Sequence, residues 1–375
     1  MNRYFHGGEI NKYRKRGVDI RYDFSINLSP LGTPKEVSDS ITDYIREGNL
    51  SKYPDTDCTE LRKKIAGRYD TDIRNVVVSN GASDLIYSIA KAVKKMKKKS
   101  SSEGVSRALI IEPSFLEYER SLSEEGYETE HYMCNEEEGF IPKDCFFENR
   151  ELLKSVSLIF IANPSNPAGV LTAPENLEKL LCICDEEGVK TVIDESFIDF
   201  VSERDRYSFR KKIQDHSSLI VLNSFTKYYS MPDVRIGYVL CSDRELVNEI
   251  ANEGQPWKVS GIFQRAALSA LDIDDEEYRK TLIQLLLREK EKISAFFDEN
   301  NIRYIAGDAG FILFFTEIPE FYERMLNKGI LIRDCSNYYG LCKGCYRIAI
   351  KRSDENDVLL EALREIMQSR KDKNV

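Results

Sequence analysis

A lysine follows an apolar run near the middle of the chain, in the segment Ser224-Phe225-Thr226-Lys227. The run before it, Leu219-Ile220-Val221-Leu222, has the composition of a buried strand, so we expect Lys227 at the turn where that strand ends. A charged ammonium group at a buried turn is costly unless it is neutralised or bonded. A Schiff base with a carbonyl cofactor would neutralise it, and the sequence therefore indicates Lys227 as a catalytic residue.

Pyridoxal phosphate is a carbonyl cofactor that needs such a lysine, an acid beside its pyridine nitrogen and donors around its phosphate. Asp194 follows the apolar run Thr191-Val192-Ile193 and is a candidate for that acid. Gly81 and Ala82 lie where we expect a helix to begin, so their N–H groups are candidate phosphate donors. The other candidate cofactor ligands are Phe115 against the ring, Asn166 at the phenolic oxygen, and Ser224, Thr226 and Arg235 around the phosphate.

Five short apolar runs must position these residues. The runs lie at 76–78, 108–111, 158–161, 191–193 and 219–222, with stretches of helical composition between them. They predict strands buried on both faces, as in a mostly parallel sheet covered by helices. Ligands of such sheets bind beyond the carboxyl ends of the strands. Each polar cluster that follows a run is by itself better explained as a turn, but a lysine and an aspartate among the five favour one assembled site.

The pattern changes after Asp272. Between residues 276 and 300, apolar side chains recur at helical spacing, which predicts a long helix. We expect it to lead into a smaller α+β region with strands at 310–315 and 346–350. The predicted organisation is an N-terminal arm (1–35) that contributes to the small domain and the active site, a large cofactor-binding domain (36–272) and a small C-terminal domain (273–375).

Composition argues against several classes of protein. The 54 lysines and arginines and the 63 aspartates and glutamates give a net charge of −9, whereas a nucleic-acid binder would carry a basic surface. No apolar stretch approaches the roughly 18 residues of a membrane span, and the first residues lack the apolar core of a signal peptide. The basic run at 94–102 is interpreted as a solvated helix end and loop. We therefore expect a cytoplasmic protein that binds neither nucleic acid nor membrane.

The nine cysteines are an odd number in a long chain without a secretory signal, and we interpret them as mostly reduced cytosolic thiols. The CxxC pair of Cys342 and Cys345 lacks the second pair or the nearby histidines that a structural zinc site would need. We interpret both residues as loop cysteines and expect no metal, and a redox role for them stays open.

Three motifs, in order along the chain, resemble those of a known family. They are Asn-Pro-Ser-Asn-Pro at 163–167, Asp194-Glu195, and Ser224-Phe225-Thr226-Lys227 followed by Arg235. In these motifs the chain resembles the fold-type I pyridoxal phosphate enzymes, in the aminotransferase class that includes histidinol-phosphate aminotransferase. The resemblance implies an α/β fold of three layers, with a mostly parallel sheet and a smaller α+β domain.

Within that class the chain is most similar to the threonine-phosphate decarboxylase family of cobalamin biosynthesis. The family's opening Asn-x-Asn-Pro reads Asn27-Leu28-Ser29-Pro30 here. Phe197 stands where many aminotransferases have a tyrosine that bonds the cofactor oxygen, and the decarboxylases resemble this chain in having phenylalanine. The matching segments lie between residues 6 and 350 and include His6-Gly7-Gly8, 23–27, Tyr53-Pro54-Asp55, 194–200, Pro256-Trp257, 332–338 and 346–350.

This resemblance implies a role for each matching residue. Lys227 would form the Schiff base, Asp194 would bind the pyridine nitrogen, and Tyr53 would reach the cofactor phosphate of the other subunit of a homodimer. Arg347 would bind the substrate carboxylate. The substrate phosphate would be surrounded by His6, Asn27 and Arg333, with Asn166 also facing the substrate; an arginine fork and a histidine suit a phosphate dianion.

The implied reaction is the decarboxylation of L-threonine O-3-phosphate to (R)-1-aminopropan-2-yl phosphate and CO2. The alternative is histidinol-phosphate aminotransferase or a related aminotransferase, in which the α-carbon loses its proton instead. The bond that breaks is the one held perpendicular to the cofactor ring, and the resemblance favours the carboxylate. A regulatory module of the same fold, fused to a DNA-binding domain, is disfavoured because no basic helix-turn-helix segment precedes the first predicted strand.

Overall fold

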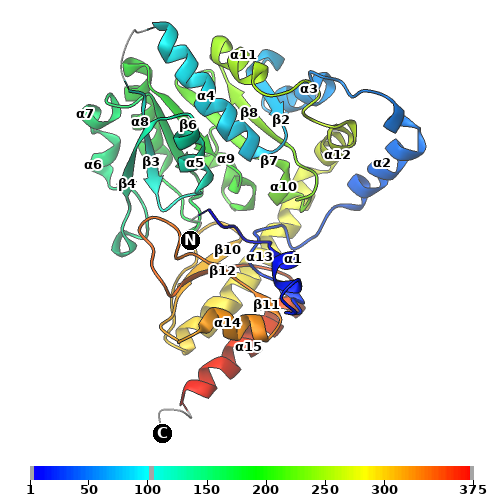
Figure 1. Ribbon diagram of the computed structural model, residues 1–375, viewed down its shortest axis with the longest axis vertical. Helices are drawn as coiled ribbons and strands as arrows, with labels where there is room; N and C mark the ends of the chain where they lie inside the picture. Colours follow the sequence, from blue (N-terminus) through cyan, green and yellow to red (C-terminus); the bar gives the residue numbers. More distant parts are fainter. Residues whose placement is uncertain (1–3, 101–104, 372–375) are drawn as a thin grey trace.

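Two β-sheets organise the molecule, a seven-stranded sheet in the upper half of Figure 1 and a four-stranded sheet below it. The computed structural model describes residues 4–100 and 105–371. The order of strands in the large sheet is β2-β8-β7-β6-β5-β3-β4. These strands are β2 (Val76–Ser79), β3 (Arg107–Glu112), β4 (Glu128–Met133), β5 (Leu158–Ala162), β6 (Lys190–Asp194), β7 (Leu219–Ser224) and β8 (Gly237–Cys241).

The large sheet is mostly parallel, as predicted. Each of the five predicted runs forms a strand, namely β2, β3, β5, β6 and β7. All neighbouring strands from β4 to β7 pair in parallel, whereas β8 is antiparallel to both β2 and β7. Strands β4 and β8 were not predicted from the sequence. β4 lacks an apolar run because it is an edge strand whose side chains are only partly buried.

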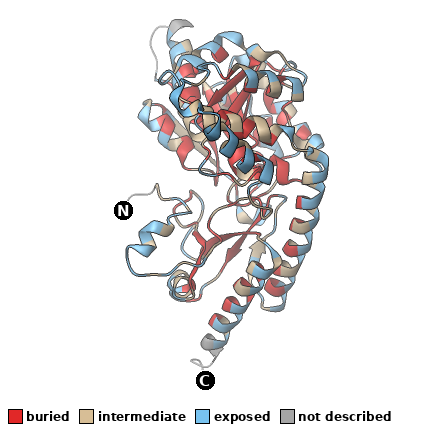
Figure 2. Ribbon diagram, turned by 90° about the vertical axis from the view of Figure 1, so that its right-hand side faces the viewer, coloured by how far each residue is buried: buried red, intermediate tan, exposed pale blue. Residues whose placement is uncertain are grey.

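Helices cover both faces of this sheet, which explains why its strands are apolar throughout. Alternate residues of a strand point to opposite faces, so Phe160 packs in one core cluster and its neighbours Ile159 and Ile161 pack in another. Figure 2 shows the buried strands enclosed by helices whose outer faces are exposed. The first cluster includes helices α4 (Ala82–Ser100), α5 (Glu117–Glu124) and α11 (Arg244–Asn252), and the second includes α3 (Thr59–Arg68), α8 (Pro174–Glu187) and α12 (Gly261–Asp272).

The C-terminal part of the chain forms the smaller sheet, in the order β12-β13-β10-β9 with every pair antiparallel. The long helix predicted at 276–300 is α13 (Asp275–Glu299), which leads from the large sheet to the small one (Figure 1). Asp274 caps it by accepting hydrogen bonds from the N–H groups of Glu276 and Glu277. The other elements here are β9 (Arg303–Ile305), β10 (Phe311–Phe315), α14 (Phe321–Asn327), β12 (Arg333–Asp334), β13 (Cys345–Ala349) and α15 (Ser353–Lys371).

The N-terminal segment attaches to this C-terminal part. Strand β1 (Tyr22–Asp23) pairs in parallel with β11 (Ile330–Leu331). The backbone continues this contact, because Phe24 N donates to Leu331 O at 2.7 Å and Ala349 N donates to Phe24 O at 2.9 Å. Both ends of the chain therefore meet beside the small sheet. The exact division into domains at residues 35 and 272 stays a prediction.

The remaining helices are shorter, apart from α2. They are α1 (Ile10–Arg14), α2 (Lys35–Arg46), α6 (Asp144–Phe147), α7 (Arg150–Leu153), α9 (Arg204–Tyr207) and α10 (Phe225–Tyr228). The predicted helix end in the basic run at 94–102 is the end of α4, and residues 101 and 102 lie outside the described part of the chain. Within residues 4–100 and 105–371, no helix combines the length and the apolar composition needed to cross a bilayer.

Candidate active site

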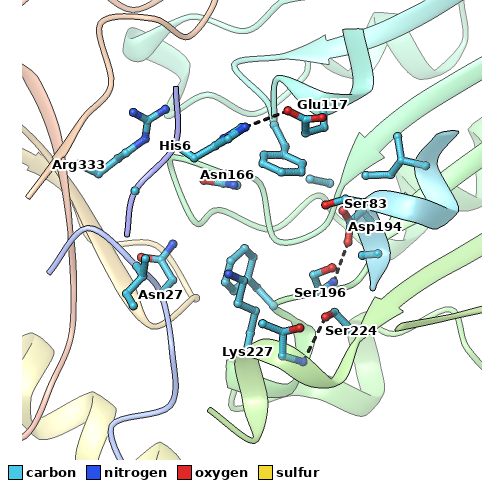
Figure 3. Close-up of a pocket in the computed structure, with 18 of the residues that line it drawn as sticks. His6, Asn27, Ser83, Glu117, Asn166, Asp194, Ser196, Ser224, Lys227 and Arg333 are labelled. Atoms are coloured by element: carbon cyan, nitrogen blue, oxygen red, sulfur yellow. Dashed lines mark hydrogen bonds and ion pairs between the residues drawn. The ribbon is translucent and has the colours of Figure 1, made fainter. Parts of the chain in front are cut away.

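A pocket of about 320 Å³ lies at the carboxyl ends of the central strands of the large sheet (Figure 3). Its walls come from the N-terminal segment, from loops of the large sheet, and from β12 and β13. It therefore collects residues from the two ends of the chain and from its middle. The sequence-predicted residues that line it are His6, Asn27, Ala82, Phe115, Asn166, Asp194, Ser224, Thr226, Lys227, Arg235, Arg333 and Arg347.

Lys227 lies in the short helix α10, directly after β7. Ser224 caps this helix by accepting a hydrogen bond from Thr226 N at 3.2 Å, which fixes the turn that carries the lysine. Burial, together with the nearby charges of Arg347 and Arg235, lowers the pKa of Lys227 to about 8, although Asp194 opposes this shift. A substantial fraction of the amine is therefore neutral near physiological pH, which is the form that attacks a carbonyl carbon.

Asp194 ends β6, and its buried carboxylate is held from two sides. The Tyr118 hydroxyl donates to Oδ2 at 2.5 Å, and Ser196 N donates to Oδ1 at 2.8 Å. Burial raises the pKa of Asp194, and these two hydrogen bonds oppose that rise because they favour the ionised form. The Tyr118 ring is stacked on Phe160 with centroids 4.8 Å apart, so the tyrosine is a rigid donor. This arrangement can hold a carboxylate against a protonated ring nitrogen.

The first turn of α4 lines the pocket together with the hydroxyl-bearing Ser224 and Thr226 and with Arg235. The hydroxyl oxygen of Thr226 is buried and has no hydrogen-bond partner among the described residues. Gly81 lies against Arg235, since a Cβ on this glycine would be 3.0 Å from the guanidinium Nη2. No ion pair joins Arg235 to a carboxylate in the described ranges. A helix N-terminus, an unpartnered hydroxyl and an unpaired guanidinium together form a site for an anion such as a phosphate.

A glycine in β8 allows this anion site to form. Gly237 passes directly beside the start of α4, and a Cβ on it would lie 2.7 Å from Ala82 N and 2.9 Å from Asn223 O. Real Cβ atoms do not approach backbone atoms so closely, so any larger residue would push α4 away from β7. The position of the helix N-terminus relative to Ser224 and Thr226 therefore depends on Gly237.

Arg333 and Arg347 lie directly opposite each other on the neighbouring strands β12 and β13. Their side chains are buried, with only 3% and 6% of each residue exposed. Within the described residues neither guanidinium forms an ion pair with a carboxylate. Because a buried charge without a counterion is costly, two such arginines in one pocket indicate a ligand with anionic groups.

The two arginines have different neighbours. Arg333 donates to Asn337 Oδ1 at 2.9 Å and lies over the rings of Phe5 and Tyr338. Arg347 donates to Ser25 O at 3.0 Å and to Asn166 Oδ1. With its amide oxygen turned toward Arg347, Asn27 accepts hydrogen bonds of 3.2 Å from both Nε and Nη1. Asn27 thus contacts Arg347, the expected carboxylate ligand, although the sequence analysis grouped it with Arg333 and His6.

Tyr53 does not line this pocket. It is 81% exposed and its ring lies against Trp257, with ring centroids 4.6 Å apart. Two adjoining exposed aromatic rings of this kind are more typical of a surface that another protein covers than of solvent-exposed surface. The role of Tyr53 in a second subunit stays a prediction.

The structure adds residues to the pocket that the sequence analysis did not select. Glu117 and Tyr118 follow Phe115 at the start of α5, and one faces His6 while the other faces Asp194. Their position two and three residues after Phe115, a predicted ring-stacking residue, was a usable signal. Tyr338 lies at the end of the matched segment 332–338 but had no assigned role. The full set of additional lining residues is Gly7, Ser25, Ile26, Ser83, Ile86, Glu117, Tyr118, Ala162, Pro164, Ser196 and Tyr338, and Phe197, noted in the sequence only as the replacement of a tyrosine, lines the pocket as well.

The cysteines lie outside the pocket lining. All nine fall in the described ranges and are free thiols, with Cys342 exposed and Cys345 buried. Across those ranges, no three histidine, cysteine, aspartate or glutamate side chains gather in a way that could hold a metal ion.

A family model supplies the broadest comparison. The model described as aminotransferase class I and II matches residues 20–363, which is most of the chain. The chain belongs to this family. The prediction made from the three motifs is thereby confirmed, and so is the fold-type I α/β architecture. Class I and II aminotransferase relatives depend on pyridoxal phosphate, and the low pKa of Lys227, the buried Asp194 and the unpartnered hydroxyl of Thr226 fit that cofactor.

Individual members of the family narrow the comparison. A protein of Caldanaerobacter subterraneus subsp. tengcongensis, which carries the provisional name of threonine-phosphate decarboxylase, is 32% identical over 98% of this chain and 95% of its own. The threonine-phosphate decarboxylase of Salmonella typhimurium is 29% identical over 96% of both chains. An adenosylcobalamin biosynthesis bifunctional protein of Leptospira interrogans is 30% identical over 98% of this chain and 41% of its own.

Solved structures of class I and II aminotransferase relatives have the same fold. The L-threonine-O-3-phosphate decarboxylase of Porphyromonas gingivalis superposes with a TM-score of 0.78 at 25% identity, covering 92% of this chain and 99% of the other. The histidinol-phosphate aminotransferase of Clostridium acetobutylicum superposes with a TM-score of 0.81 at 27% identity, covering 93% and 99%. The overall fold therefore does not distinguish a decarboxylase from an aminotransferase, and the residues that line the pocket must make that distinction.

Proposed function

We propose that this enzyme decarboxylates L-threonine O-3-phosphate to (R)-1-aminopropan-2-yl phosphate and CO2, as a step of cobalamin biosynthesis. The observation that carries the proposal is the pair of buried arginines, Arg333 and Arg347, without carboxylate partners in the same pocket as Lys227. The proposed substrate has two anionic groups, a carboxylate and a phosphate, which match two guanidinium groups. The similarity to threonine-phosphate decarboxylases over nearly the whole chain supports the same choice.

The proposed cofactor ligands follow from their places in the pocket. Lys227 would bind the aldehyde carbon through Nζ, Asp194 would keep a proton on the pyridine nitrogen, and Phe115 would lie against the ring. Asn166 would bond the phenolic oxygen. The phosphate would be held by the Ala82 N–H together with Ser224, Thr226 and Arg235, whereas the Gly81 N–H, predicted as a further donor, donates to Ser79 O at 2.8 Å. When bound, pyridoxal phosphate supplies the electron sink that accepts the electron pair left on the α-carbon as CO2 departs.

The proposed substrate ligands divide between the two ends of the substrate. Arg333 and His6 would hold the phosphate, and Arg347 would hold the carboxylate with Asn27 and Asn166 beside it. Holding the substrate at both ends fixes rotation about its central bonds, so that the carboxylate is the group that leaves. Lys227 Nζ would then return a proton to the α-carbon, which completes the replacement of the carboxylate by hydrogen.

Histidinol-phosphate aminotransferase is the second candidate, because a structure with that activity superposes equally well. That substrate shares the phosphate and the amine but has no carboxylate. Phe197 favours the decarboxylase, because it lines the pocket where many aminotransferases have a tyrosine. A phenylalanine there offers the cofactor oxygen no hydroxyl.

The test is a direct comparison of the two reactions. The holoenzyme is incubated with L-threonine O-3-phosphate and no keto acid, and CO2 and (R)-1-aminopropan-2-yl phosphate are measured. In parallel it receives histidinol phosphate with 2-oxoglutarate, and glutamate is measured. We expect stoichiometric CO2 and product in the first reaction and none with Lys227→Ala. Glutamate formation without CO2 release would instead identify an aminotransferase.

We also propose a homodimer in which Tyr53 enters the site of the neighbouring subunit. The exposed pair of Tyr53 and Trp257 supports this arrangement. Co-expression of Tyr53→Ala and Lys227→Ala chains tests it, because a mixed dimer would contain one site with both native residues. Random pairing should then restore about a quarter of the wild-type activity. If Tyr53 served its own subunit, the mixture would stay inactive.

We further propose that the protein works in the reducing environment of the cytoplasm. The support is that all nine cysteines are free thiols, six of them buried. Thiol titration of the denatured protein, isolated under conditions that prevent oxidation, should give nine free thiols per chain. A lower value would indicate disulfides and contradict the assignment.

A further inference from the structure

The carboxylate of Glu117 links the substrate pocket to the N-terminal segment that lies over it. Glu117 is the first residue of α5 and is only 7% exposed. Its Oε1 lies 2.9 Å from His6 Nε2, and its Oε2 accepts a hydrogen bond of 2.8 Å from the Tyr87 hydroxyl. Figure 3 shows His6 directed toward this carboxylate, with Arg333 nearby.

The residues on either side of His6 are hydrogen-bonded to Ser25 and Asn337, which lie beside the small sheet. Gly8 N donates to Ser25 Oγ at 2.8 Å, and Asn337 Nδ2 donates to Phe5 O at 3.2 Å. A Cβ on Gly7 would overlap the carbonyl oxygen of Ser25, so the segment packs tightly there. The backbone of His6 is therefore held beside the small sheet, whereas its side chain reaches across the pocket to α5, which belongs to the large sheet. Without Glu117, the backbone of His6 would stay in place, but the imidazole ring would lose the contact that orients it.

Glu117 also has polar partners other than His6. The Tyr87 hydroxyl donates to one oxygen, and Arg120 Nη1 lies 3.8 Å from the other. The pKa of Glu117 lies below its usual range, mainly because of the hydrogen bond from His6, with Tyr87 and Arg120 contributing. Glu117 is therefore ionised in this setting, and an ionised carboxylate can only accept hydrogen bonds.

This requirement determines where the protons of His6 lie. Since Glu117 only accepts, Nε2 of His6 must carry a proton, and Nδ1 is left for a ligand. Nδ1 can donate to a phosphate oxygen when both ring nitrogens are protonated.

We infer that Glu117 is a positioning residue for the substrate phosphate and acts through His6, while Tyr87 fixes Glu117 in turn. The inference rests on the proposed function, since it needs a phosphorylated substrate in the pocket. It adds two residues, one on α5 and one on α4, to the apparatus that recognises the phosphate. It also gives α5 a double role, because Glu117 orients a substrate ligand and Tyr118 orients Asp194.

Binding measurements on the holoenzyme test this inference. The affinities for L-threonine O-3-phosphate and for unphosphorylated L-threonine are read from changes in the cofactor absorbance. We expect Glu117→Ala to weaken binding of the phosphorylated ligand about tenfold and binding of L-threonine less than about twofold. In a His6→Ala background, Glu117→Ala should have no further effect. The control is Glu124→Ala on the same helix, whose exposed carboxylate pairs with Arg120 at 3.2 Å and should leave both affinities unchanged.

Two milder variants keep the test decisive if Glu117→Ala does not fold. Glu117→Gln retains an acceptor for Nε2–H but not the charge, and Tyr87→Phe removes the donor that fixes Glu117. Both variants should weaken binding of the phosphorylated ligand by about threefold to tenfold without affecting binding of L-threonine. Equal weakening of both ligands, or an undiminished effect in the His6→Ala background, would overturn the inference. If the wild type binds histidinol phosphate but not threonine phosphate, the proposed function is wrong. The role of Glu117 is then tested by comparing the affinities for histidinol phosphate and for histidinol.

Discussion

The Tyr118 hydroxyl donates a 2.5 Å hydrogen bond to the Asp194 carboxylate, and both groups are buried in the floor of the pocket. Tyr118 reaches Asp194 from α5, so the helix and β6 jointly define where the carboxylate points. Burial alone raises the pKa of Asp194, whereas the hydrogen bonds from Ser196 and Tyr118 lower it. The ionisation of Asp194 therefore depends on a residue 76 positions away in the sequence.

Tyr118→Phe should weaken cofactor binding while preserving the fold. The substitution removes one donor to Asp194, which raises the pKa of the carboxyl further and leaves it less often ionised. We expect the dissociation constant of pyridoxal phosphate to rise about tenfold, measured by fluorescence titration of the apoprotein. Tyr132→Phe, a tyrosine outside the pocket, is a matched control and should bind the cofactor normally. An unchanged affinity in Tyr118→Phe would show that Ser196 alone holds Asp194.

The rate at which the apoprotein captures pyridoxal phosphate should depend on pH through Lys227. Its pKa is lowered to about 8, and only the neutral amine reacts, so the rate should rise with pH through this value. We expect about a tenfold increase between pH 7 and a plateau above about pH 9. Stopped-flow absorbance gives this rate directly. A rate that still rises beyond pH 10 would mean that Lys227 titrates like an ordinary lysine.

Thr226→Val should separate cofactor binding from stability. The Thr226 hydroxyl is buried without a partner among the described residues, so its loss breaks no hydrogen bond inside the protein. We expect the apoprotein of the variant to melt at the same temperature as the wild type or slightly higher. Its affinity for pyridoxal phosphate should fall about tenfold, because the phosphate loses a donor. A lower melting temperature of the apoprotein would reveal a structural role for the hydroxyl instead.

Arg333 and Arg347 should be separable with ligands that each lack one anionic group. (R)-1-Aminopropan-2-yl phosphate has no carboxylate, and L-threonine has no phosphate. Arg333→Gln should weaken binding of the phosphate ligand about 10- to 100-fold and leave binding of L-threonine unchanged. Arg347→Gln should weaken binding of L-threonine by a similar factor and leave binding of the phosphate ligand unchanged. Competition against the decarboxylase reaction measures both constants. The opposite pattern would exchange the roles assigned to the two arginines.

Arg210→Met should destabilise the protein by about 3–5 kcal/mol. Arg210 donates to both carboxylate oxygens of Asp199, at 2.9 and 2.8 Å, and its Nε lies 2.9 Å from Glu195 Oε2. Removing the guanidinium leaves the buried Glu195 carboxylate without its cation and leaves Asp199 with Arg204, whose Nη1 is 3.4 Å away. Urea unfolding of the apoprotein measures the change, with the exposed Arg206→Met as control. A loss below about 1 kcal/mol would show that the site relaxes or admits water.

The amino-acid sequence by itself determined the fold class and about half of the residues that line the pocket. Apolar runs such as 158–161 are continuous because both strand faces are buried, so they predict strands from local composition alone. Lys227 and Asp194 could be selected because each follows such a run, and the ends of parallel strands meet at one edge. The motifs around them then identified the family, which a comparison over residues 20–363 confirmed.

Tertiary structure alone decided the contacts between residues that are far apart along the chain. The pairing of Glu117 with His6 spans 111 positions, and local sequence carries no signal for such a pair. It also decided that Asn27 lies against Arg347, because the order of β12, β13 and the N-terminal segment sets which side chains share a wall. Lys227 has a lowered pKa for the same reason. Its burial and the nearness of two arginines arise only when the sheets pack together.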